Sequence, residues 1–455
     1  MAIPLQPEGP AMSSAIRRGR VGLLVSGSLL AATVATGQPR SPIDVFDPRD
    51  RTLKVAVQHF AQTSGGASRV ADELHSNILG GLNFSGIFTV LDERAFLGPV
   101  KSPRLGARAT VPCSSWRQIG ADALVQGEVQ ASADSLKVRF QVLDVSRGCR
   151  RQKSNQFDAK RNQARRVGKA IADDVVAAFT GRPGVADTEI AFVSNRGGSK
   201  EVHVMDADGQ QLRGATRNRS INSFPDWSPD GSAILYTTYR HRNRPTLFLL
   251  TRGRKSPGRI LRNMKAPGAL YRGVYSPDGG RLALVMSKAG ATEIFTIDRN
   301  GGGLRNLTRS RAIEVSPAWS PDGRRIAFVS DRSGAPQIYV MSAEGGAPRR
   351  LTYNGSYNTS PTWSPDGQWI AYESRVGGQF DIWLIDPEGS TNQPLVTHRR
   401  SDEHPSFAPD SRKLAFSSTR RGRADIYVVD ISGANLRRVT DRGENTAPDW
   451  GPYRR

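Results

Sequence analysis

Short apolar runs of the strand type, separated by turn signals, recur along the second half of the chain. In the best-defined stretch, the turn Ser-Pro-Asp-Gly at 320–323 stands between the apolar runs 318–319 and 326–329. Proline at the second turn position presets φ, and glycine at the fourth accepts the positive φ of a tight hairpin. Another apolar run, 338–341, follows a glycine-containing turn. The pattern predicts an antiparallel meander of short strands.

This turn recurs at a nearly constant interval. Its first residue stands at 228, 276, 320, 364, 408 and 451, although the last two copies are degraded to APDS and GPYR. An aromatic residue precedes each copy: Trp227, Tyr275, Trp319, Trp363, Phe407 and Trp450. Apolar strand openings recur with the same interval: Ile190, Ile234, Leu282, Ile326, Ile370 and Leu414. An interval of roughly 40–50 residues holding four short strands is typical of a β-propeller blade, so six copies predict six blades.

The two ends of the repeat region complement each other. The region opens at Ile190 with the strand that should come second in a blade, and it ends at 447–450 with the strand that should come first. We therefore expect the C-terminal strand to pair with the first blade. Such closure of the ring removes the exposed sheet edges that invite aggregation.

Strand and helix patterns alternate ahead of the repeats. Strands are predicted at 53–57, 88–91, 123–129, 136–145 and 155–157, and helices at 68–82, 116–120 and 163–180. The last helix has the strongest apolar face, formed by Val167, Ala170, Ile171, Asp174, Val175 and Ala178, and Gly181 ends it. The predicted fold class is an α/β N-terminal domain at 38–182, followed by an all-β six-bladed β-propeller at 186–455 that the C-terminal strand closes.

The α/β domain begins with an extended polar segment, 41–51. Within it, Ile43, Val45 and Phe46 alternate around Asp44. An extended segment of this kind can pair with the edge of its own sheet or with the edge of a partner's sheet.

The first 37 residues have the pattern of an export signal. Arg17, Arg18 and Arg20 form a basic region, an apolar run covers 21–35, and small residues follow up to Gly37. Cleavage is expected near Gly37. The apolar run is too short for a membrane-spanning helix, so no span is expected in the mature chain. The pattern predicts export by the general secretion route.

Charge and cysteine content bear on three possibilities: a nucleic-acid partner, a metal site and a disulfide. The chain has 455 residues with 64 Lys and Arg against 42 Asp and Glu, a formal net charge of +22. The basic residues are scattered through the turns without a nucleic-acid-binding motif, so no nucleic-acid partner is expected. The two cysteines, Cys113 and Cys149, stand in no metal-binding pattern. They can form a disulfide or remain two free thiols, and the sequence does not decide between these.

The innermost strands of a propeller begin at the mouth of its channel. Residues just before each Pro-x-Trp pattern should therefore line this mouth. Ordinary solvation of strand starts would account for polar residues there, but the geometry of the ring as a whole favours the docking of a partner. The predicted ring is Phe224, Tyr271, Arg272, Val315, Ser316, Thr359, Ser360, Glu403, His404 and Thr446. His404 beside Glu403 could serve as a metal ligand or an acid–base pair, but a polar rim explains the pair more simply. No catalytic residue, metal site or cofactor is predicted; a cation in the propeller channel is compatible with the sequence, although no pattern requires one.

Three motifs in the α/β domain carry a family resemblance. They are LNFSGIFTVLDERAFL from Leu82, WRQIGADALVQGEV from Trp116 and VRFQVLDVSRG from Val138. With the export signal and the SPDG repeats, they make the chain resemble the TolB family, the periplasmic components of the Tol–Pal envelope system. The resemblance implies a monomeric adaptor without enzymatic activity. It implies that the propeller binds the lipoprotein Pal, that the segment 43–46 contacts the inner-membrane protein TolA, and that the system serves outer-membrane invagination at division and envelope integrity.

Two other functions are compatible with a propeller. A peptidase-like hydrolase would need a G-x-S-x-G nucleophile elbow, and the sequence contains none. A carbohydrate-binding propeller has no such diagnostic motif, so the sequence leaves that alternative open.

Overall fold

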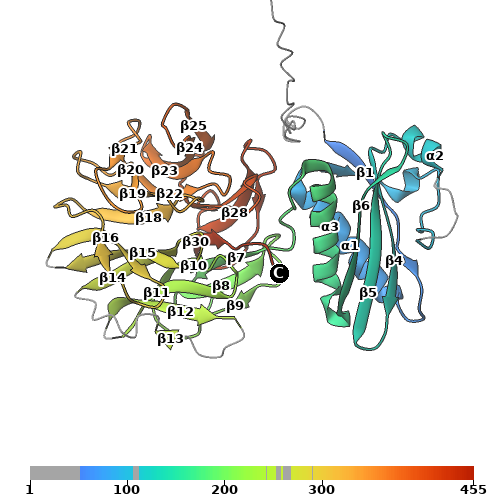
Figure 1. The fold of residues 1–455 in the computed structure, drawn as a ribbon, viewed down its shortest axis with the longest axis horizontal. Helices are drawn as coiled ribbons and strands as arrows, with labels where there is room; N and C mark the ends of the chain where they lie inside the picture. The colour runs from blue at the N-terminus through green and yellow to red at the C-terminus, as the bar shows by residue number, and fades with distance from the viewer. Residues whose placement is uncertain are drawn as a thin grey trace, which may run out of the picture. The chain divides into compact units, whose positions relative to one another are not determined.

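A computed structural model describes residues 52–105, 112–241, 243–252, 258–259, 268–288 and 290–454 (Figure 1). The predicted export signal, 1–37, and the predicted partner-binding segment Ile43, Asp44, Val45 and Phe46 lie outside the described residues.

The N-terminal domain is a sheet covered by two helices. The strands follow the order β3-β1-β4-β5-β6, with β2 paired to β4. Strand β1 is parallel to β3 and β4, whereas β4, β5 and β6 form an antiparallel meander. The strands are β1 Leu53–Val57, β2 Ala61–Gln62, β3 Phe88–Val90, β4 Ala123–Ala131, β5 Ser135–Asp144 and β6 Arg150–Lys160. The helices are α1 Ser68–Ser85, α2 Cys113–Gln118 and α3 Ala164–Thr180, with short 3-10 turns η2 Glu93–Ala95 and η3 Arg161–Gln163.

Both long helices bury the apolar faces that their periodicity predicts. Val70, Leu74, Ile78 and Leu82 of α1 share one core with α3 and with the inward residues of the sheet. Each helix ends at a glycine in the left-handed conformation, Gly86 for α1 and Gly181 for α3. This conformation lets backbone N–H groups at the helix end bond to carbonyls of the last turn that would otherwise be unpaired. The α/β class is confirmed.

Three details of this domain differ from the prediction. Strand β6 has 11 residues instead of three, because it is a polar edge strand whose sequence lacks apolar alternation. Helix α2 begins at Cys113, ahead of the predicted start at Trp116. On α3 the buried carboxylate is Asp173, which accepts hydrogen bonds from the backbone N–H of Ala186 and Asp187, whereas Asp174 bonds to Asn155 at the sheet.

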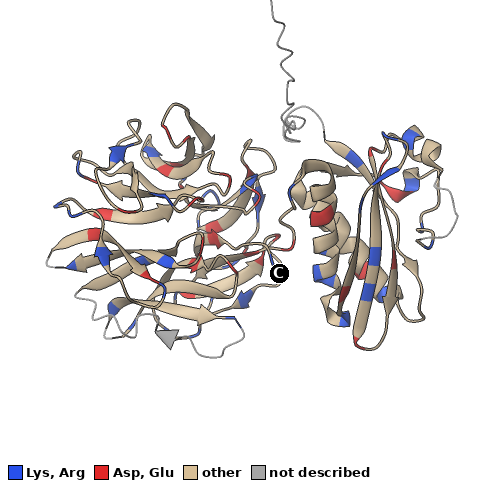
Figure 2. Cartoon of the chain, in the orientation of Figure 1, with Lys and Arg blue, Asp and Glu red and all other residues tan. Residues whose placement is uncertain are grey.

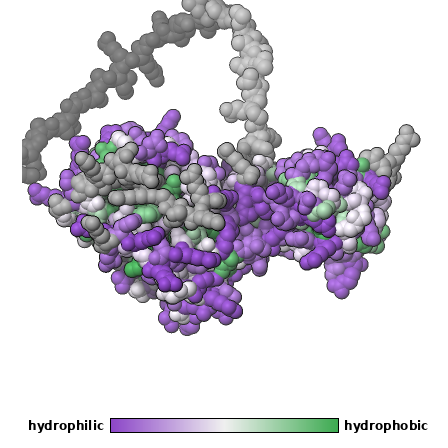
Figure 3. Space-filling model, turned by 90° about the horizontal axis from the view of Figure 1, so that it is seen from below, coloured by the Kyte–Doolittle hydropathy of each residue, from purple (hydrophilic) through white to green (hydrophobic). Residues whose placement is uncertain are grey.

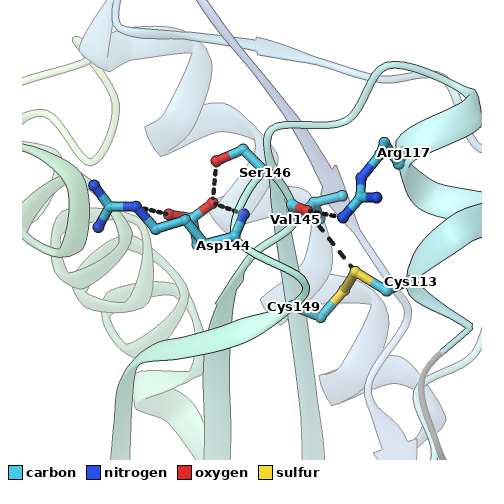
Figure 4. Close-up of a disulfide and its surroundings, with 7 residues drawn as sticks. Cys113, Arg117, Asp144, Val145, Ser146 and Cys149 are labelled. Carbon is cyan, nitrogen blue, oxygen red and sulfur yellow. Dashed lines mark hydrogen bonds and ion pairs between the residues drawn. A yellow bond between two sulfur atoms is a disulfide. The ribbon is translucent and has the colours of Figure 1, made fainter.

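A disulfide joins the two cysteines of the chain. Cys113 at the start of α2 bonds to Cys149 in the turn between β5 and β6, and Arg117 lies near the same Val145 carbonyl as the Cys113 sulfur (Figure 4). The bond borders a small second core around the fully buried Trp116. It fastens α2 to the meander on the side of the sheet away from the main core.

The propeller consists of six four-stranded antiparallel sheets, each taken in sequence order except the closing one. The closing sheet has the order β30-β7-β8-β9, so the last strand of the chain is the innermost strand of the first blade. Trp450 pairs with Ile190 and Thr446 pairs with Val193. The predicted six blades and the predicted closure by the C-terminal strand are therefore confirmed.

The strands of the propeller are short, as their turn spacing predicts. Their bounds, in chain order, are β7 Glu189–Ser194, β8 Glu201–Asp206, β9 Arg213–Gly214, β10 Asn222–Trp227, β11 Ala233–His241, β12 Arg244–Thr251, β13 Gly258–Arg259, β14 Ala269–Tyr275, β15 Arg281–Lys288, β16 Ala291–Asp298, β17 Arg305–Asn306, β18 Glu314–Trp319, β19 Arg325–Ser330, β20 Gln337–Ser342, β21 Arg349–Arg350, β22 Asn358–Trp363, β23 Ile370–Val376, β24 Gln379–Ile385, β25 Asn392–Val396, β26 Asp402–Phe407, β27 Lys413–Ser418, β28 Asp425–Asp430, β29 Arg437–Arg438 and β30 Asn445–Trp450.

The SPDG turns have the geometry that their residues dictate. In the turn after β18, the N–H of Gly323 donates to the Ser320 carbonyl at 2.9 Å, and Gly323 has φ 69°. The Ser320 hydroxyl donates to Asp322 at 2.5 Å, which holds the carboxylate inside the turn. In the degraded copy, Ser411 replaces the glycine and still takes φ 65°. Turn formation therefore accounts for the repeated aspartate without a bound cation.

Many of the excess arginines have structural partners in the propeller. The guanidinium of Arg281 lies 5.0 Å from the ring centre of Trp319 in the next blade, and Arg325 lies at the same distance from Trp363. Arg281 also pairs with Glu344, and one blade further on Arg325 pairs with Glu388. Figure 2 shows basic and acidic residues scattered over both parts of the chain. On the face drawn in Figure 3, hydrophilic residues predominate.

Among the described residues, no helix is both long and apolar enough to cross a membrane.

Candidate docking site in the propeller channel

Five of the six inner strands carry the same backbone irregularity. The residue before the inner-strand proline has a positive φ, between 49° and 56°, and the pairing register shifts there. The residues are Phe224, Ser316, Ser360, His404 and Ala447. Left-handed backbone is costly for non-glycine residues, and a residue before proline normally avoids helical conformations. Such bulges redirect side chains and are concentrated at functional sites.

The sixth inner strand, β14, has a different sequence and backbone at the corresponding position. Strand β14 has Arg272-Gly273 where the others have a residue and proline, and its register shifts between Leu270 and Arg272. A side chain on Gly273 would come within 2.9 Å of Leu235 and Leu247 of the preceding blade. Glycine therefore lets β14 approach its neighbour, and Arg272 is the one arginine that the inner strands bring into the channel among the described residues.

Four of the ten predicted ring residues line a common cavity of about 200 Å³ in the channel: Phe224, Arg272, Ser360 and His404. We call it the channel cavity. Its wall also contains the five inner-strand prolines, two acids and two tryptophans: Pro225, Pro317, Pro361, Pro405, Pro448, Asp226, Asp449, Trp319 and Trp363. The cavity is thus bounded by rigid groups from all six blades, which suits recognition without large rearrangement.

The other six predicted ring residues do not line this cavity. Thr359, Glu403 and Thr446 pair with Glu373, Ser417 and Val193 in the sheet ladder near the start of their strands. Ser316 has the bulged backbone, and Tyr271 is an exposed aromatic residue. Val315 packs against the cores of two neighbouring blades, so its side chain serves packing.

Charged groups inside the channel cavity are close enough to interact. The Arg272 guanidinium lies 5.3 Å from the ring centre of Phe224. The carboxylates of Asp226 and Asp449 link successive blades, because Asp226 accepts from the N–H of Tyr275 at 2.8 Å and Asp449 accepts from the N–H of Trp227 at 2.7 Å. Desolvation in the channel raises the pKa of both carboxyl groups, and the charge of Asp449 adds to the effect on Asp226.

His404 belongs to a polar group around the bulged backbone of strand β26. Its own N–H donates to Glu373 at 2.7 Å, and its Nδ1 lies 3.4 Å from the Ser417 hydroxyl. Burial and the neighbouring charge of Glu373 raise the pKa of Glu403. Ser417 is almost fully buried and donates to the Glu403 carbonyl, so it is not accessible as a nucleophile. The arrangement fits a polar rim better than an acid–base site.

Exposed apolar side chains stand at the end of the channel where the inner strands begin. Ile221, Ile313 and Tyr357 each precede the first residue of an inner strand, and they are 50%, 55% and 38% exposed. Tyr271 on β14 is 38% exposed. We call these four residues the apolar rim. Large apolar groups exposed around a polar cavity are a common feature of protein interfaces. Ile221, Ile313 and Tyr357 were not predicted from the sequence, although each stands four residues before an inner-strand proline.

Buried polar residues hold this end of the channel in place. Inner strands begin with a fully buried polar residue in five blades: Asn222, Glu314, Asn358, Asp402 and Asn445. Glu314 pairs with Arg332 and Asp402 pairs with Arg420, both of which also bond to a serine at the end of the second strand of the blade. The sequence signal for these pairs is a recurring Ser-x-Arg at 194–196, 330–332 and 418–420.

The channel carboxylates predict a distinctive pH dependence. Desolvation raises the pKa of Asp449 to about 7, whereas an aspartate in the unfolded chain has a pKa of about 4. The folded protein therefore binds the proton more tightly, so the stabilisation present at low pH is lost as the pH rises from about 4 to about 7. Asp449→Asn keeps an acceptor for the Trp227 N–H. We expect its free energy of unfolding, relative to that of the unchanged protein, to increase across this window in denaturant titrations.

Asp230→Asn is the matched control for this prediction. The Ser228 hydroxyl and the Ser232 N–H and hydroxyl lower the pKa of Asp230 to about 2. Its contribution is present above pH 4 and is lost as the pH falls towards 2, so this variant should lose stability at neutral pH. A pH-independent difference for Asp449→Asn would contradict the desolvated carboxylate.

Comparison with known proteins identifies the fold and its family. A family model described as the TolB beta propeller domain matches residues 176–454, more than half of the chain. A second model, the TolB amino-terminal domain, matches residues 41–151. The chain belongs to the TolB family. The family predicted from the motifs is thereby confirmed.

Curated relatives in the TolB family are moderately similar to the chain. The Tol-Pal system protein TolB of Anaeromyxobacter dehalogenans (strain 2CP-C) is 37% identical over 302 residues, 66% of this chain and 67% of the relative. The protein of the same name from Dinoroseobacter shibae is 35% identical over 325 residues, 67% of this chain and 68% of the relative. The matched regions thus span about two thirds of these TolB proteins.

A solved TolB structure matches most of the chain. The crystal structure of TolB from Acinetobacter baumannii aligns with a TM-score of 0.74 and 26% identity, covering 89% of this chain and 97% of that one. The N-terminal domain and the propeller therefore both occur, in this order, in a known TolB protein.

Proposed function

We propose that this TolB-family chain is a non-catalytic, monomeric adaptor of the periplasm. In this proposal the channel end of the propeller binds a peptidoglycan-associated lipoprotein of the Pal type, and the segment Ile43–Phe46 binds a TolA-like inner-membrane protein. The adaptor would serve outer-membrane invagination at division and envelope integrity. No cofactor is required for this role.

One observation carries the proposal: all six blades line one polar channel cavity, and four exposed apolar residues stand at or near the start of the inner strands of the same propeller. The cavity combines a cation, two carboxylates and aromatic faces. A protein partner can cover the exposed side chains of the apolar rim and remove them from water. A small solute cannot cover all four of them. A rim of Ile221, Ile313, Tyr357 and Tyr271 therefore favours a protein ligand over a hydrolysable substrate or a sugar.

Deletion of the segment 41–47 separates the two proposed interactions. The segment precedes the first described strand, so its removal should leave the fold and the binding of a soluble Pal-like domain unchanged. Binding of a TolA-like domain should be lost. Size-exclusion chromatography and calorimetry of the mature chain and the deletion variant, each with both purified domains, would measure this.

Two outcomes would contradict the proposed function. Absence of a complex between the mature chain and the Pal-like domain would remove the docking role. A protein that fractionates with the cytoplasm in cells would separate the chain from both proposed partners.

A further inference from the structure

Two histidines and a glutamate meet at one edge of the N-terminal domain. His59 follows strand β1, His75 lies on helix α1 and Glu93 opens the short turn η2. Nε2 of His59 lies 3.0 Å from Oε1 of Glu93, and Nε2 of His75 lies 2.9 Å from the same oxygen. All three candidate ligand atoms lie within 4.8 Å of one another. His59 and His75 are 16 positions apart in sequence, and His75 and Glu93 are 18 positions apart. No local motif therefore indicates the cluster.

The three side chains are held by ordered backbone. The N–H of His59 donates to the Val100 carbonyl at 2.9 Å, and the N–H of Ser102 donates to the His59 carbonyl at 2.8 Å. His75 is buried on α1, next to Leu74, which is part of the main core. The turn that carries Glu93 is capped by Asp92, whose carboxylate accepts from the N–H of Arg94 at 2.9 Å. Sites built on fixed elements bind metals more tightly than sites that must be assembled.

The spacing of the ligand atoms is close to that of a tetrahedral metal site. Zn²⁺ binds imidazole nitrogen and carboxylate oxygen at about 2.0–2.2 Å, which places neighbouring ligands of a tetrahedron roughly 3.3–3.5 Å apart. The observed separations of 2.9 and 3.0 Å are a few tenths of an ångström shorter than the tetrahedral spacing, and the stacked imidazole rings must also rotate before both Nε2 atoms face one ion. Two histidines with one glutamate form a three-ligand set that occurs in zinc proteins, with a fourth position left for water.

The arrangement without a metal leaves polar groups poorly satisfied. The imidazole rings stack with centres 3.9 Å apart and an interplanar angle of 13°, and both direct Nε2 at a single oxygen. Among the described residues, the buried Nδ1 of His75 has no hydrogen-bond partner.

We propose that His59, His75 and Glu93 form a binding site for one divalent transition-metal ion of the Zn²⁺ class. Nε2 of each histidine and a carboxylate oxygen of Glu93 are the protein ligands, and water takes the fourth position. Access is open, because His59 and Glu93 are about one third exposed at their side chains. The ion would connect strand β1, helix α1 and turn η2. The nitrogen ligands disfavour Mg²⁺ and Ca²⁺, which prefer oxygen.

The affinity should be moderate. Metal-binding histidines usually donate their second ring N–H to a carboxylate or carbonyl group, and loss of that partner weakens metal binding by about 10–100-fold. Nδ1 of His75 has no such partner among the described residues. We therefore expect Zn²⁺ to bind about 10–100-fold more weakly than at a site whose histidines both have such a partner.

Calorimetry with ZnSO₄ on the chelator-treated, desalted mature protein tests the site. The expected result is one Zn²⁺ per chain, with a rise in the melting temperature of the N-terminal domain. His59→Gln and Glu93→Gln should each weaken binding at least about 10-fold while the metal-free variants melt near the unchanged protein. Glu93→Gln retains an acceptor for hydrogen bonds from the histidines, so it separates metal binding from folding. His241→Gln, an exposed histidine of the propeller, should bind as the unchanged protein does.

Three results would overturn the proposed site. They are the absence of saturable Zn²⁺ binding, binding that both ligand variants retain, and a preference for Ca²⁺ over Zn²⁺. The site is independent of the proposed docking function, because it lies in the N-terminal domain and its readout needs no protein partner.

Discussion

Removal of residues 446–455 should open the propeller and destabilise the protein severely. The deletion takes away β30, the innermost strand of the first blade, and leaves the inner edge of β7 unpaired. It also removes Trp450, which is buried in a core with Ile190 and Phe192. Loss of a large buried aromatic costs about 3–5 kcal/mol by itself, and the unpaired edge adds a template for aggregation.

Two point variants of Trp450 separate the contribution of its ring from that of its hydrogen bond. Trp450→Ala should lower the free energy of unfolding by about 3–5 kcal/mol through the cavity that it creates. Trp450→Phe keeps a ring and loses chiefly the Nε1–H donation to the Thr188 hydroxyl at 2.8 Å, worth about 1 kcal/mol. Denaturant unfolding and light scattering would measure the series. A truncated protein that stays monomeric with an unchanged melting temperature would show that β30 does not close the ring.

Loss of the disulfide should destabilise the N-terminal domain by about 2–4 kcal/mol. Cys113 and Cys149 are 36 residues apart in sequence, so the bond restricts a substantial loop of the unfolded chain. The bond also holds α2 and Trp116 against the second core. The double variant Cys113→Ser, Cys149→Ser removes both contributions. Native-state hydrogen exchange of the β4 and β5 amides is the appropriate measurement, because it reports this domain separately from the propeller.

A reductant supplies the control for the disulfide. The chain has two cysteines, both in the N-terminal domain, so reduction should lower the protection of the unchanged protein to that of the double variant. The double variant should not respond to reductant. Equal exchange rates in the oxidised protein and the double variant would contradict a stabilising bond.

The repeat architecture could be predicted from the sequence because each blade repeats the same short sequence features. The turn residues, the aromatic residue before each turn and the apolar strand openings all have fixed offsets, and Ile190 and Trp450 fit together as complementary ends. The polar edge strand β6 could not be predicted in full. Its residues face solvent on an outer strand, so ladder hydrogen bonds define it more than apolar alternation does.

The candidate docking site was only partly predictable. The proline in five of the six inner strands indicated the region, but not the left-handed backbone that precedes it at residues such as Phe224 and His404. Sequence also could not indicate that Val315 faces two cores while Ile313, two positions earlier, is exposed. The cluster of His59, His75 and Glu93 depends on where a strand, a helix and a turn meet, and such tertiary contacts have no local signature.

Calorimetric titration of a soluble Pal-like domain into Arg272→Ala tests the docking site most directly. Arg272 lies in the channel cavity over Phe224, whereas Arg324 is exposed beside the SPDG turn at the other end of an inner strand. Both substitutions remove one positive charge. We expect Arg272→Ala to weaken binding by about 1–3 kcal/mol, roughly 5–150-fold, as for a central interface contact, and Arg324→Ala to leave it unchanged. Equal losses in the two variants would indicate diffuse charge attraction and contradict docking at the channel.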